Sequence, residues 1–575
     1  MLKLFRFLKP YILPIVTVLA LMFMGAMADL ILPTLMANIV NTGVVNGDIA
    51  YIFRTGAFML LIAFGGISCA VLSSFFSSGV TLGFSKKVRS GIFARVESYS
   101  LYEFDRIGTA SLVTRTTNDV NQLQASLSMM MSIMVRAPIM CVGGVIMAVS
   151  RDRVLSLVLF LAVPLLAVLI ISIAGRGVSL FSAMQSKLDR LNMIIREKLS
   201  GIRVVRAFDR TEREKERFDG ASRGIMDTAM EIAGIMNLMM PAVMLVMNFT
   251  IIAVLWFGGL RAAAGNMRVG DIMAFVQYST QILFSLMMVS MLFIMIPRAQ
   301  ASAVRINEVL ELEPGIRDPE TAKRGGKRKG SVEFRDVSFT YHGAEQPAIC
   351  NISFTAGPGE VTAIIGGTGS GKSTLVSLIP RFYDVESGSV IIDGMDVREM
   401  ALEDLRRRIG FVPQKAVLFS GTAADNIRFG AEGADDAGIK RAAETAQAAA
   451  FIESMEEGYD STIEQGGVNL SGGQKQRVSI ARAIARKPEI YVFDDSFSAF
   501  DFKTDAALRA ALKKETADAS VFIVAQRVAT IMDADRIIVL EDGKVAGMGA
   551  HKELMQSCGI YREIVYSQIS EEELA

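Results

Sequence analysis

Long apolar stretches fill the first half of the chain and are absent from the second half. Six runs, at about 11–33, 55–80, 129–149, 154–174, 239–260 and 271–296, are each long enough to cross a bilayer core of ~30 Å. After about residue 330, apolar residues come in short strand-like groups between charged and glycine-rich segments. The pattern predicts an α-helical polytopic membrane domain over 1–312 and an α/β domain over 331–575.

The distribution of basic residues predicts the orientation of the membrane domain. The segments 84–120 and 175–236 hold most of the lysine and arginine of the first 300 residues, which marks them as cytoplasmic. An even number of spans then places the N-terminus and the second domain on the cytoplasmic side of the cell membrane. Lys3, Arg6 and Lys9 precede the first run without a small-residue cleavage site after it, so we expect a retained span.

The two cytoplasmic connections are too long for plain loops. Apolar residues recur in them at helical spacing, as at Leu188, Leu191, Ile195 and Leu199. We therefore expect the spans to continue as helices into the cytoplasm and to turn near 105–108 and 208–211.

Composition and charge exclude several functions. Hydrophobic residues make up 51% and charged residues 21%, and a net charge of +1 offers no general attraction for nucleic acid. The four cysteines lack the spacing of a zinc site or a disulfide framework. The polar, basic stretch 313–330, rich in proline and glycine, is predicted to be a linker.

Two ionisable residues, Asp29 and Arg136, stand out inside the predicted spans, where a charge is costly and marks a candidate functional site. For Arg136 we favour a side chain that snorkels to the inner interface, whereas Asp29 either faces a wet vestibule or binds a ligand. The chain also has 33 methionines, several in clusters such as 129–131. These either line an adaptable pocket for apolar substrates or, as we favour, simply pack.

A phosphate-binding loop follows the apolar strand 361–365. Residues 366–373 fit G-x-x-x-x-G-K-[ST], in which backbone N–H groups and a helix N-terminus surround phosphates. Lys372 is predicted to reach the β- and γ-phosphates, and Ser373 to hold Mg²⁺. The predicted nucleotide-binding residues of this loop are Gly366, Gly367, Thr368, Gly369, Ser370, Gly371, Lys372, Ser373 and Thr374.

Other segments complete a candidate ATP site. Tyr341 precedes the loop by about 25 residues and is predicted to stack on a base. The apolar strand 490–493 ends in two acids, of which Asp494 is predicted to hold Mg²⁺ and Asp495 to handle the attacking water.

Together with Gln414 and the segment Leu470-Ser471-Gly472-Gly473-Gln474, these motifs resemble an ATP-binding-cassette ATPase domain. The segments 104–120 and 197–218 are similar to the intracellular loops of exporter-type transporters with fused membrane and ATPase domains. The resemblance implies two ATPase domains that clamp ATP and Mg²⁺ head to tail. It implies that Ser471, Gly472, Gly473 and Gln474 act on the γ-phosphate held by a partner subunit. It also implies that Gln414 links Mg²⁺ and water to the membrane domain, and that Asp501 communicates between the two sites.

Two positions depart from the family pattern. Asp495 stands where the family has a catalytic glutamate, and Gln526 stands where it has a histidine. The chain has two histidines, His342 and His551, and neither falls at that place. We expect this chain to bind ATP but hydrolyse it slowly, as one half of a heterodimeric exporter of amphipathic compounds such as drugs or lipids. Neutral drift in an active enzyme, an importer of the same architecture, and a regulatory ATP-binding subunit of a transporter or channel are the alternatives.

Overall fold

The computed structural model describes every residue except 1, 322, 324–328, 432 and 569–575, so part of the predicted linker lies outside the described residues. The chain divides into two compact units. The first, the membrane unit, comprises Met1–Glu97 and Thr109–Leu312, and the second, the ATPase unit, comprises Ser98–Gly108 and Glu313–Ala575.

Among the described residues, six helices of the membrane unit are long and apolar enough to cross a membrane, as the sequence predicted. The most apolar 18-residue stretch of each helix has a mean hydropathy between 1.5 and 2.9, which suits contact with lipid. The long helices are α1 (Ile12–Asn38), α2 (Ile49–Glu97), α5 (Val120–Arg151), α6 (Ser156–Ser200), α8 (Thr211–Ala263) and α9 (Val269–Glu311). Shorter helical segments are η1 (Leu2–Tyr11), η2 (Ile39–Val44), α4 (Thr109–Thr114), η3 (Arg115–Asp119) and α7 (Ile202–Ala207).

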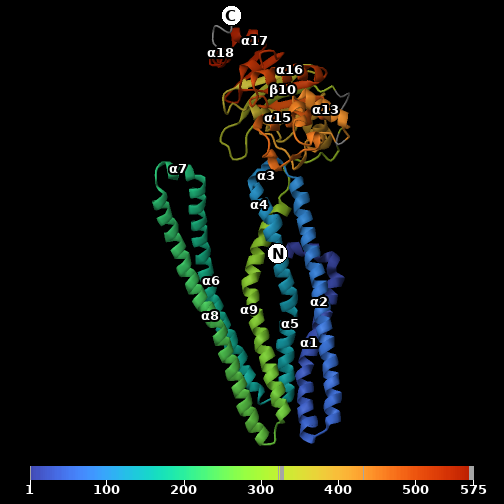
Figure 1. Cartoon of the computed structure of the whole chain (residues 1–575), viewed down its shortest axis with the longest axis vertical. Coiled ribbons are helices and arrows are strands. Elements are labelled where there is room, and N and C mark those ends of the chain that lie inside the picture. Colours follow the sequence, from blue (N-terminus) through green and yellow to red (C-terminus); the bar gives the residue numbers. More distant parts are fainter. Residues whose placement is uncertain (1, 322, 324–328, 432, 569–575) are drawn as a thin grey trace. The chain divides into compact units, whose positions relative to one another are not determined.

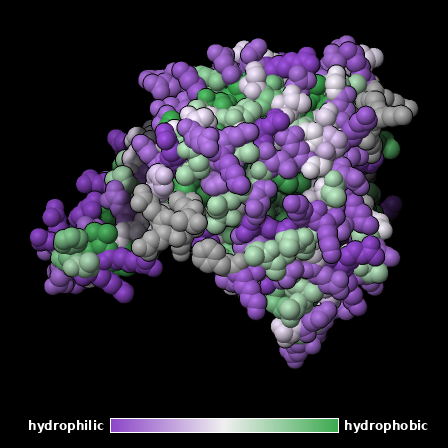
Figure 2. Space-filling model, turned by 90° about the horizontal axis from the view of Figure 1, so that it is seen from above, coloured by the Kyte–Doolittle hydropathy of each residue, from purple (hydrophilic) through white to green (hydrophobic). Residues whose placement is uncertain are grey.

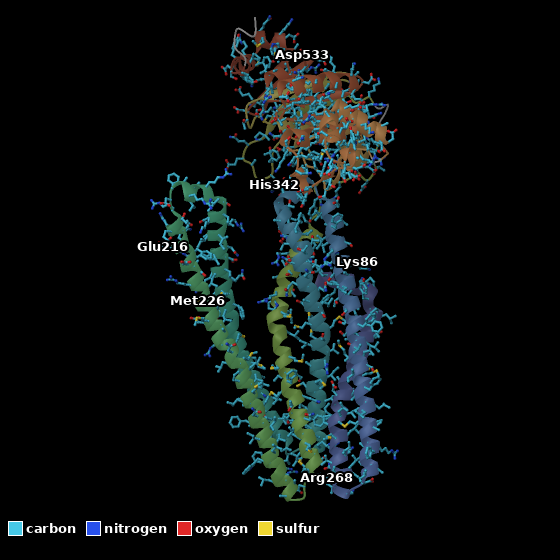
Figure 3. The ribbon with its side chains drawn as sticks, viewed as in Figure 1. Lys86, Glu216, Met226, Arg268, His342 and Asp533 are labelled. Atoms are coloured by element: carbon cyan, nitrogen blue, oxygen red, sulfur yellow. The ribbon has the colours of Figure 1, made fainter. Side chains whose placement is uncertain are left out.

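Several of these helices extend well beyond a bilayer. Helix α2 has 49 residues and α8 has 53, whereas about 20 residues suffice for one crossing. Helices α6 and α8 lie side by side and form an arm whose end, around α7, stands apart from the other helices of the unit (Figure 1). Glu216 and Met226 lie on this arm (Figure 3). Its reversal after α7 includes Asp209 at φ 50°, within the predicted turn.

The other predicted turn belongs to the ATPase unit rather than to the membrane unit. Helix α3 (Leu101–Ile107) ends at Gly108, whose φ of 78° favours glycine. One oxygen of the buried Glu103 carboxylate accepts hydrogen bonds from the backbone N–H of Ser100 at 2.8 Å and from its hydroxyl at 2.5 Å. The other oxygen accepts from the backbone N–H of Gly315 at 3.2 Å. The Tyr102 ring also lies 4.9 Å from the His342 ring, centroid to centroid (His342 is labelled in Figure 3).

The ATPase unit is built on a six-stranded sheet with the order β12-β11-β3-β10-β9-β6. Its strands are β3 (Val361–Gly366), β6 (Ile409–Val412), β9 (Ile490–Asp494), β10 (Ser520–Val524), β11 (Arg536–Glu541) and β12 (Lys544–Gly549), of which β12 alone runs antiparallel to its neighbour. A second sheet has the order β2-β1-β4-β5, from β1 (Val332–Phe339), β2 (Ile349–Ala356), β4 (Ser387–Ile392) and β5 (Met395–Asp396). Strands β7 (Gly421–Thr422) and β8 (Thr462–Ile463) form a short pair.

Helices pack around these sheets. They are α10 (Lys372–Ser377), α11 (Leu402–Arg407), α12 (Ala423–Arg428), α13 (Asp436–Thr445), α14 (Ala449–Glu453), α15 (Gly472–Ala485), α16 (Phe502–Glu515), α17 (His551–Ser557) and α18 (Gly559–Tyr566). Figure 2 looks down on this unit and shows a mostly hydrophilic face. The contrast with the apolar helices agrees with the predicted membrane and α/β fold classes.

Strands β3, β9, β10 and β11 of the six-stranded sheet are almost entirely buried, which explains why they are continuous apolar runs. In β10, Val521 and Ile523 belong to one hydrophobic core, while Phe522 and Val524 belong to another on the opposite face. Alternation of side chains along a strand produces this division. The parallel strands are therefore fixed from both sides, and so are the loops at their ends.

The described part of the 313–330 segment makes hydrogen bonds with other residues of the ATPase unit. Asp318 accepts a hydrogen bond from the backbone N–H of Leu402 at 2.7 Å. Arg381, itself buried, donates to the carbonyl of Arg317 at 3.3 Å. The assignment of 313–330 as a linker between the two domains stays a prediction.

Candidate functional site

Four neighbouring parallel strands bring the predicted catalytic residues to one edge of the sheet. The phosphate loop follows β3, Asp494 ends β9, Gln526 comes two residues after β10, and Gln414 comes two residues after β6. Val524 of β10 is in register with Asp494 on one side and with Ile364 of β3 on the other. Because carboxyl ends of parallel strands meet at one edge, segments far apart in sequence converge there.

Two glycines of the phosphate loop lie so close to neighbouring backbone carbonyls that a side chain would not fit there. Gly371 has φ 93°, and a Cβ atom there would lie 2.6 Å from the carbonyl oxygen of Ala348. A Cβ atom at Gly366 would overlap the carbonyl oxygen of Leu540. The buried hydroxyl oxygen of Ser370 has no hydrogen-bond partner among the described residues. A glycine-lined loop with an unpaired hydroxyl, at the start of α10, fits a phosphate-rich ligand such as ATP.

Lys372 lies folded along this loop. Its Nζ donates to the carbonyl oxygens of Gly366 at 2.8 Å and Gly367 at 2.6 Å. Burial lowers the pKa of Lys372, and the nearby carboxylates of Asp495 and Asp494 oppose that effect. The ammonium group therefore has polar partners that phosphate oxygens could replace, as its predicted role requires.

The predicted magnesium ligands are also adjacent. The Ser373 hydroxyl donates to Asp494 Oδ1 at 2.8 Å. Burial raises the pKa of Asp494, although the hydrogen bond from Ser373 acts in the opposite direction. Mg²⁺ is commonly bound through one or two carboxylates, waters and the phosphates of a nucleotide, and this pair of oxygen ligands fits such a site. Bound there, the ion would neutralise charge on the phosphates.

All three predicted catalytic side chains meet at one carboxylate. Asp495 Oδ2 accepts hydrogen bonds from the amide nitrogens of Gln526 at 2.8 Å and of Gln414 at 3.2 Å. The Asp495 backbone has φ 46°, a left-handed conformation that aspartate tolerates better than most residues. Its N–H donates to the carbonyl of Val524 at 3.0 Å, so the strained residue is fixed to β10.

The signature segment lies at the start of α15. Ser471 is exposed, and its hydroxyl accepts from the backbone N–H of Gln474 at 3.3 Å. The Gln474 side chain accepts in return from the Ser471 N–H at 2.8 Å. This capping box orients the exposed helix N-terminus, including Gly472 and Gly473, toward solvent. Its predicted action on a partner's ATP stays a prediction.

Asp501 and Tyr341 also have local partners. Asp501 caps α16 and accepts from the Thr504 N–H at 2.9 Å and hydroxyl at 2.8 Å, which lowers the pKa of Asp501. The Tyr341 hydroxyl lies 3.0 Å from that of Thr374 in α10, and the ring stays 40% exposed. Base stacking by Tyr341 and signalling by Asp501 both remain predictions.

The two histidines lie away from this carboxylate. His551 Nδ1 is 2.7 Å from the hydroxyl of Tyr561, and His342 packs beside Tyr102. Sequence reasoning missed two features: the hydrogen bonds that both glutamines make to Asp495, and the anchoring role of Glu103. The second had a visible signal, since Ser100-x-x-Glu103 is a capping-box pattern.

Comparisons with known proteins agree with this geometry. A family model described as the ABC transporter transmembrane region matches residues 15–287, and one described as ABC transporter matches 349–498. An uncharacterized ABC transporter ATP-binding protein of Mycobacterium tuberculosis is 42% identical over 98% of this chain and 97% of its own length. A fatty acid ABC transporter ATP-binding/permease protein of Mycobacterium bovis is 34% identical over 83% of this chain and 75% of its own length. The solved structure of a bacterial Atm1-family ABC exporter with ATP bound aligns with a TM-score of 0.81 and 26% identity, covering 97% of this chain and 98% of that one.

Proposed function

This chain belongs to the ABC transporter family, and from that premise we propose that it is one of two unlike subunits of an ATP-driven exporter of amphipathic compounds. It is a polytopic membrane protein of the exporter fold with an ATP-binding domain. The proposal adds that its own ATP site hydrolyses slowly, while its exposed signature segment completes the site of a second half-transporter.

The observation that supports this most is the pair of amide donors on Asp495. A general base must accept a proton from the attacking water. Both Gln526, at 2.8 Å, and Gln414, at 3.2 Å, donate to the same oxygen of Asp495. In this geometry Gln526 keeps the carboxylate of Asp495, which is shorter than the glutamate of the family, away from an attacking water. The neutral amide of Gln526 also supplies no ionisable group beside the γ-phosphate. Binding and hydrolysis are thereby separated.

The residues that bind phosphate differ from those that perform hydrolysis. Lys372, Ser373 and the glycines keep the form expected of an ATP site, and Ser471 keeps an exposed position at a helix N-terminus. Loss of function throughout the domain would not spare these groups selectively. An intact signature beside an altered base is therefore best explained by a partner that carries the faster site.

The transported class and the direction are proposed from relatives and from the membrane unit. One relative is named a fatty acid transporter, and the aligned solved structure is named an exporter. Apolar spans that enclose charged and hydroxyl side chains suit a ligand with a polar head and an apolar tail. We place the protein in the cytoplasmic membrane with its ATPase unit on the cytoplasmic side, because basic residues gather on the connections 84–120 and 175–236.

Co-purification tests the two-subunit assembly. The gene is expressed alone and together with any half-transporter encoded beside it, and substrate-stimulated ATP hydrolysis is compared at equal protein concentration. We expect the mixed complex to be much more active. A stable complex of this chain alone, with stimulated hydrolysis equal to that of the best mixed preparation, contradicts the proposal.

Nucleotide binding at this chain's own loop is tested separately with Lys372→Ala, because the Lys372 ammonium group is predicted to contact the β- and γ-phosphates. Photolabelling with an azido-ATP analogue should show weaker occupancy of this chain in the variant, whereas Lys187→Ala, on the arm of α6, should leave occupancy unchanged. Equal labelling of wild type and Lys372→Ala would exclude the assigned role of this lysine.

A further inference from the structure

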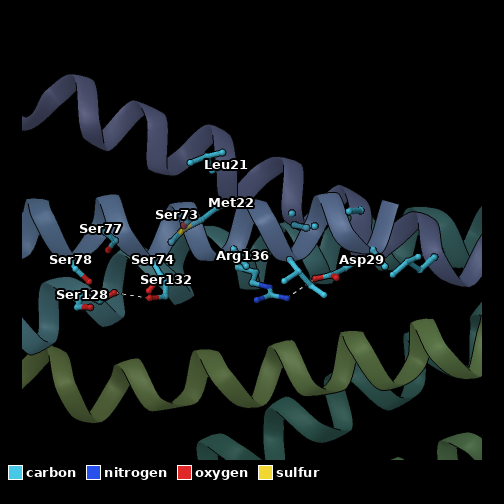
Figure 4. A pocket seen from close by; sticks show the side chains of 18 residues that line it. Leu21, Met22, Asp29, Ser73, Ser74, Ser77, Ser78, Ser128, Ser132 and Arg136 are labelled. Carbon is cyan, nitrogen blue, oxygen red and sulfur yellow. Dashed lines mark hydrogen bonds and ion pairs between the residues drawn. The ribbon is translucent and has the colours of Figure 1, made fainter. Parts of the chain in front are cut away.

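A cavity of about 470 Å³ lies between α1, α2 and α5 within the membrane unit. Its wall changes character along its length. Six serines from α2 and α5 lie on one side of Arg136, and Asp29 lies on the other (Figure 4). The serines are Ser73, Ser74, Ser77, Ser78, Ser128 and Ser132. These hydroxyl groups make this part of the cavity wall polar, whereas contact with lipid tails alone would need no polar group.

Asp29 and Arg136 form an ion pair with each other, and this corrects the expectation that Arg136 snorkels to the interface. Arg136 Nη2 lies 2.5 Å from Asp29 Oδ2. The side chains keep 54% and 33% of their exposure, so a ligand in the cavity can reach both. Asp29 is the 18th of 27 residues of α1, and Arg136 is the 17th of 32 residues of α5, which puts the pair far from either helix end.

A second cavity of about 540 Å³ shares Asp29 and Leu32 with the first. Its wall is mostly apolar, with three methionines, Met36, Met59 and Met273. These are not the methionine clusters singled out in the sequence. Gln281 also lines this cavity: its amide nitrogen donates to the Asp29 carbonyl at 3.3 Å, and its buried Oε1 has no partner among the described residues. An unpaired buried acceptor indicates a missing donor.

The chemistry of the two cavities defines a ligand. Both volumes lie in the range of small-molecule sites, about 300–1,000 Å³. A polar wall joined to a methionine-rich apolar wall suits one molecule with a head in the first cavity and a chain in the second. The ion pair between them carries no net charge. A ligand with a single charge would displace one member of the pair and leave that member uncompensated inside the membrane, which is strongly unfavourable.

We propose that these two cavities, which share Asp29 and Leu32, together bind an amphiphile with a zwitterionic head. Its anionic group binds Arg136, its cationic group binds Asp29, and its apolar chain lies among the methionines. Such a ligand replaces both halves of the ion pair at once and leaves no charge unpaired. The proposal rests on the proposed transport function and narrows its substrate class. Selectivity then comes mainly from rejection of singly charged ligands.

Equilibrium binding without nucleotide tests the site separately from ATP turnover. The full-length protein, in the complex in which it purifies, is held in an uncharged sugar detergent. Three probes with the same twelve-carbon chain are compared: dodecylphosphocholine, dodecanoate and dodecyltrimethylammonium. Wild type should bind the zwitterion at least about tenfold more tightly than either ion, since a single ion leaves one charged group of the pair without a hydrogen-bonded partner.

Matched variants should invert the preference. Asp29→Asn leaves Arg136 without its carboxylate and should shift the preference to dodecanoate by about tenfold or more, while Arg136→Gln should shift it to dodecyltrimethylammonium. The exchanged double variant Asp29→Arg/Arg136→Asp keeps the pair and should keep the zwitterion preference. If the single variants do not fold, the neutral double variant Asp29→Asn/Arg136→Gln is used, and it should lose selectivity for head-group charge.

Two results would overturn the proposal. One is equal or tighter binding of dodecanoate to wild type, which would make the ligand an anionic lipid. The other is an unchanged order of the three probes across folded variants, which would make the ion pair purely structural. Neither result bears on the proposed ATP-driven function, because binding is measured without nucleotide and does not involve Lys372 or Asp495. Failure of that function would instead show as absent ATP-dependent transport with probe binding intact.

Discussion

Restoring the hydrolytic residues of this chain should restore turnover at its own ATP site. The perturbation is Asp495→Glu combined with Gln526→His, placed in a complex whose partner subunit has its own base disabled. In the present structure, Gln526 and Gln414 donate to Asp495 Oδ2 at 2.8 and 3.2 Å. Because both contacts converge on one oxygen, a change in side-chain length alters the whole cluster.

The magnitude follows from that geometry. Glutamate extends the side chain by one carbon–carbon bond, roughly 1.5 Å, whereas normal N–H···O hydrogen bonds span only about 0.5 Å in length, from about 2.7 to 3.2 Å. We therefore expect the longer carboxylate to leave its present donors and to reach further from β9. A positioned general base contributes ~10²–10⁴ in rate, so we expect about tenfold recovery from Asp495→Glu alone. We expect little from Gln526→His alone and about 10²-fold from the pair.

The assay is steady-state phosphate release by the purified complex, with ATP occupancy of this chain measured in parallel. Asp495→Asn is the matched control, because it keeps the length of the side chain but removes its charge, and it should stay at the background rate. A double variant that binds ATP normally and remains at background would refute the assigned roles of Asp495 and Gln526, or show that the partner's signature segment silences this site.

Three further predictions concern other parts of the ATPase unit. Ser471→Ala should lower ATP hydrolysis of the whole complex by ~10²–10³ with ATP still bound to this chain, since one donor to the transition state is lost. Ser471→Asp, which keeps the helix cap, should be equally inactive. Full activity in either variant would argue against the action of this signature segment on the ATP of the partner. Glu103→Ala should make the segment 98–108 more sensitive to limited proteolysis, because the donors of Ser100 and Gly315 lose their acceptor, and each buried donor left unpaired costs about 1–3 kcal/mol of stability. Glu103→Gln should have a smaller effect. Unchanged cleavage of Glu103→Ala would contradict the anchoring role of Glu103. Burial raises the pKa of Asp494, so the folded unit retains that proton where the unfolded chain has lost it, and the contribution of Asp494 to stability falls as pH rises from about 4. In thermal melts without nucleotide, wild type should therefore lose stability relative to Asp494→Asn as pH rises above about 4. Parallel pH profiles of the two proteins would contradict this.

Features fixed by local chemistry could be predicted from the sequence. The six helices follow from apolar runs, because a bilayer leaves a spanning chain few alternatives to a helix. The meeting of Gly366, Asp494 and Gln526 follows from motifs placed at the carboxyl ends of parallel strands. In both cases a short segment and a general rule determine the position of the residue.

Partnerships between distant side chains could not be predicted in this way. Arg136 and Asp29 are 107 residues apart, and the spans that carry them pack in a register that no local pattern encodes. The snorkelling predicted for Arg136 assumed that a membrane arginine reaches for the interface, whereas a carboxylate on another helix compensates its charge within the membrane. The same holds for Gln414 and Asp495, which lie 81 residues apart.

Glu103 combines a local feature that the sequence predicts with a distant partner that it does not predict. Its capping box is a local motif, and one carboxylate oxygen closes that box with Ser100. A carboxylate has two oxygens, so the motif also implies a spare acceptor that must find a donor once it is buried. The sequence predicts the need but not the donor, which is the N–H of Gly315, 212 residues away. That bond joins the two sequence segments of the ATPase unit, because Glu103 lies in Ser98–Gly108, between two membrane helices in the sequence, and Gly315 lies where the unit resumes at Glu313.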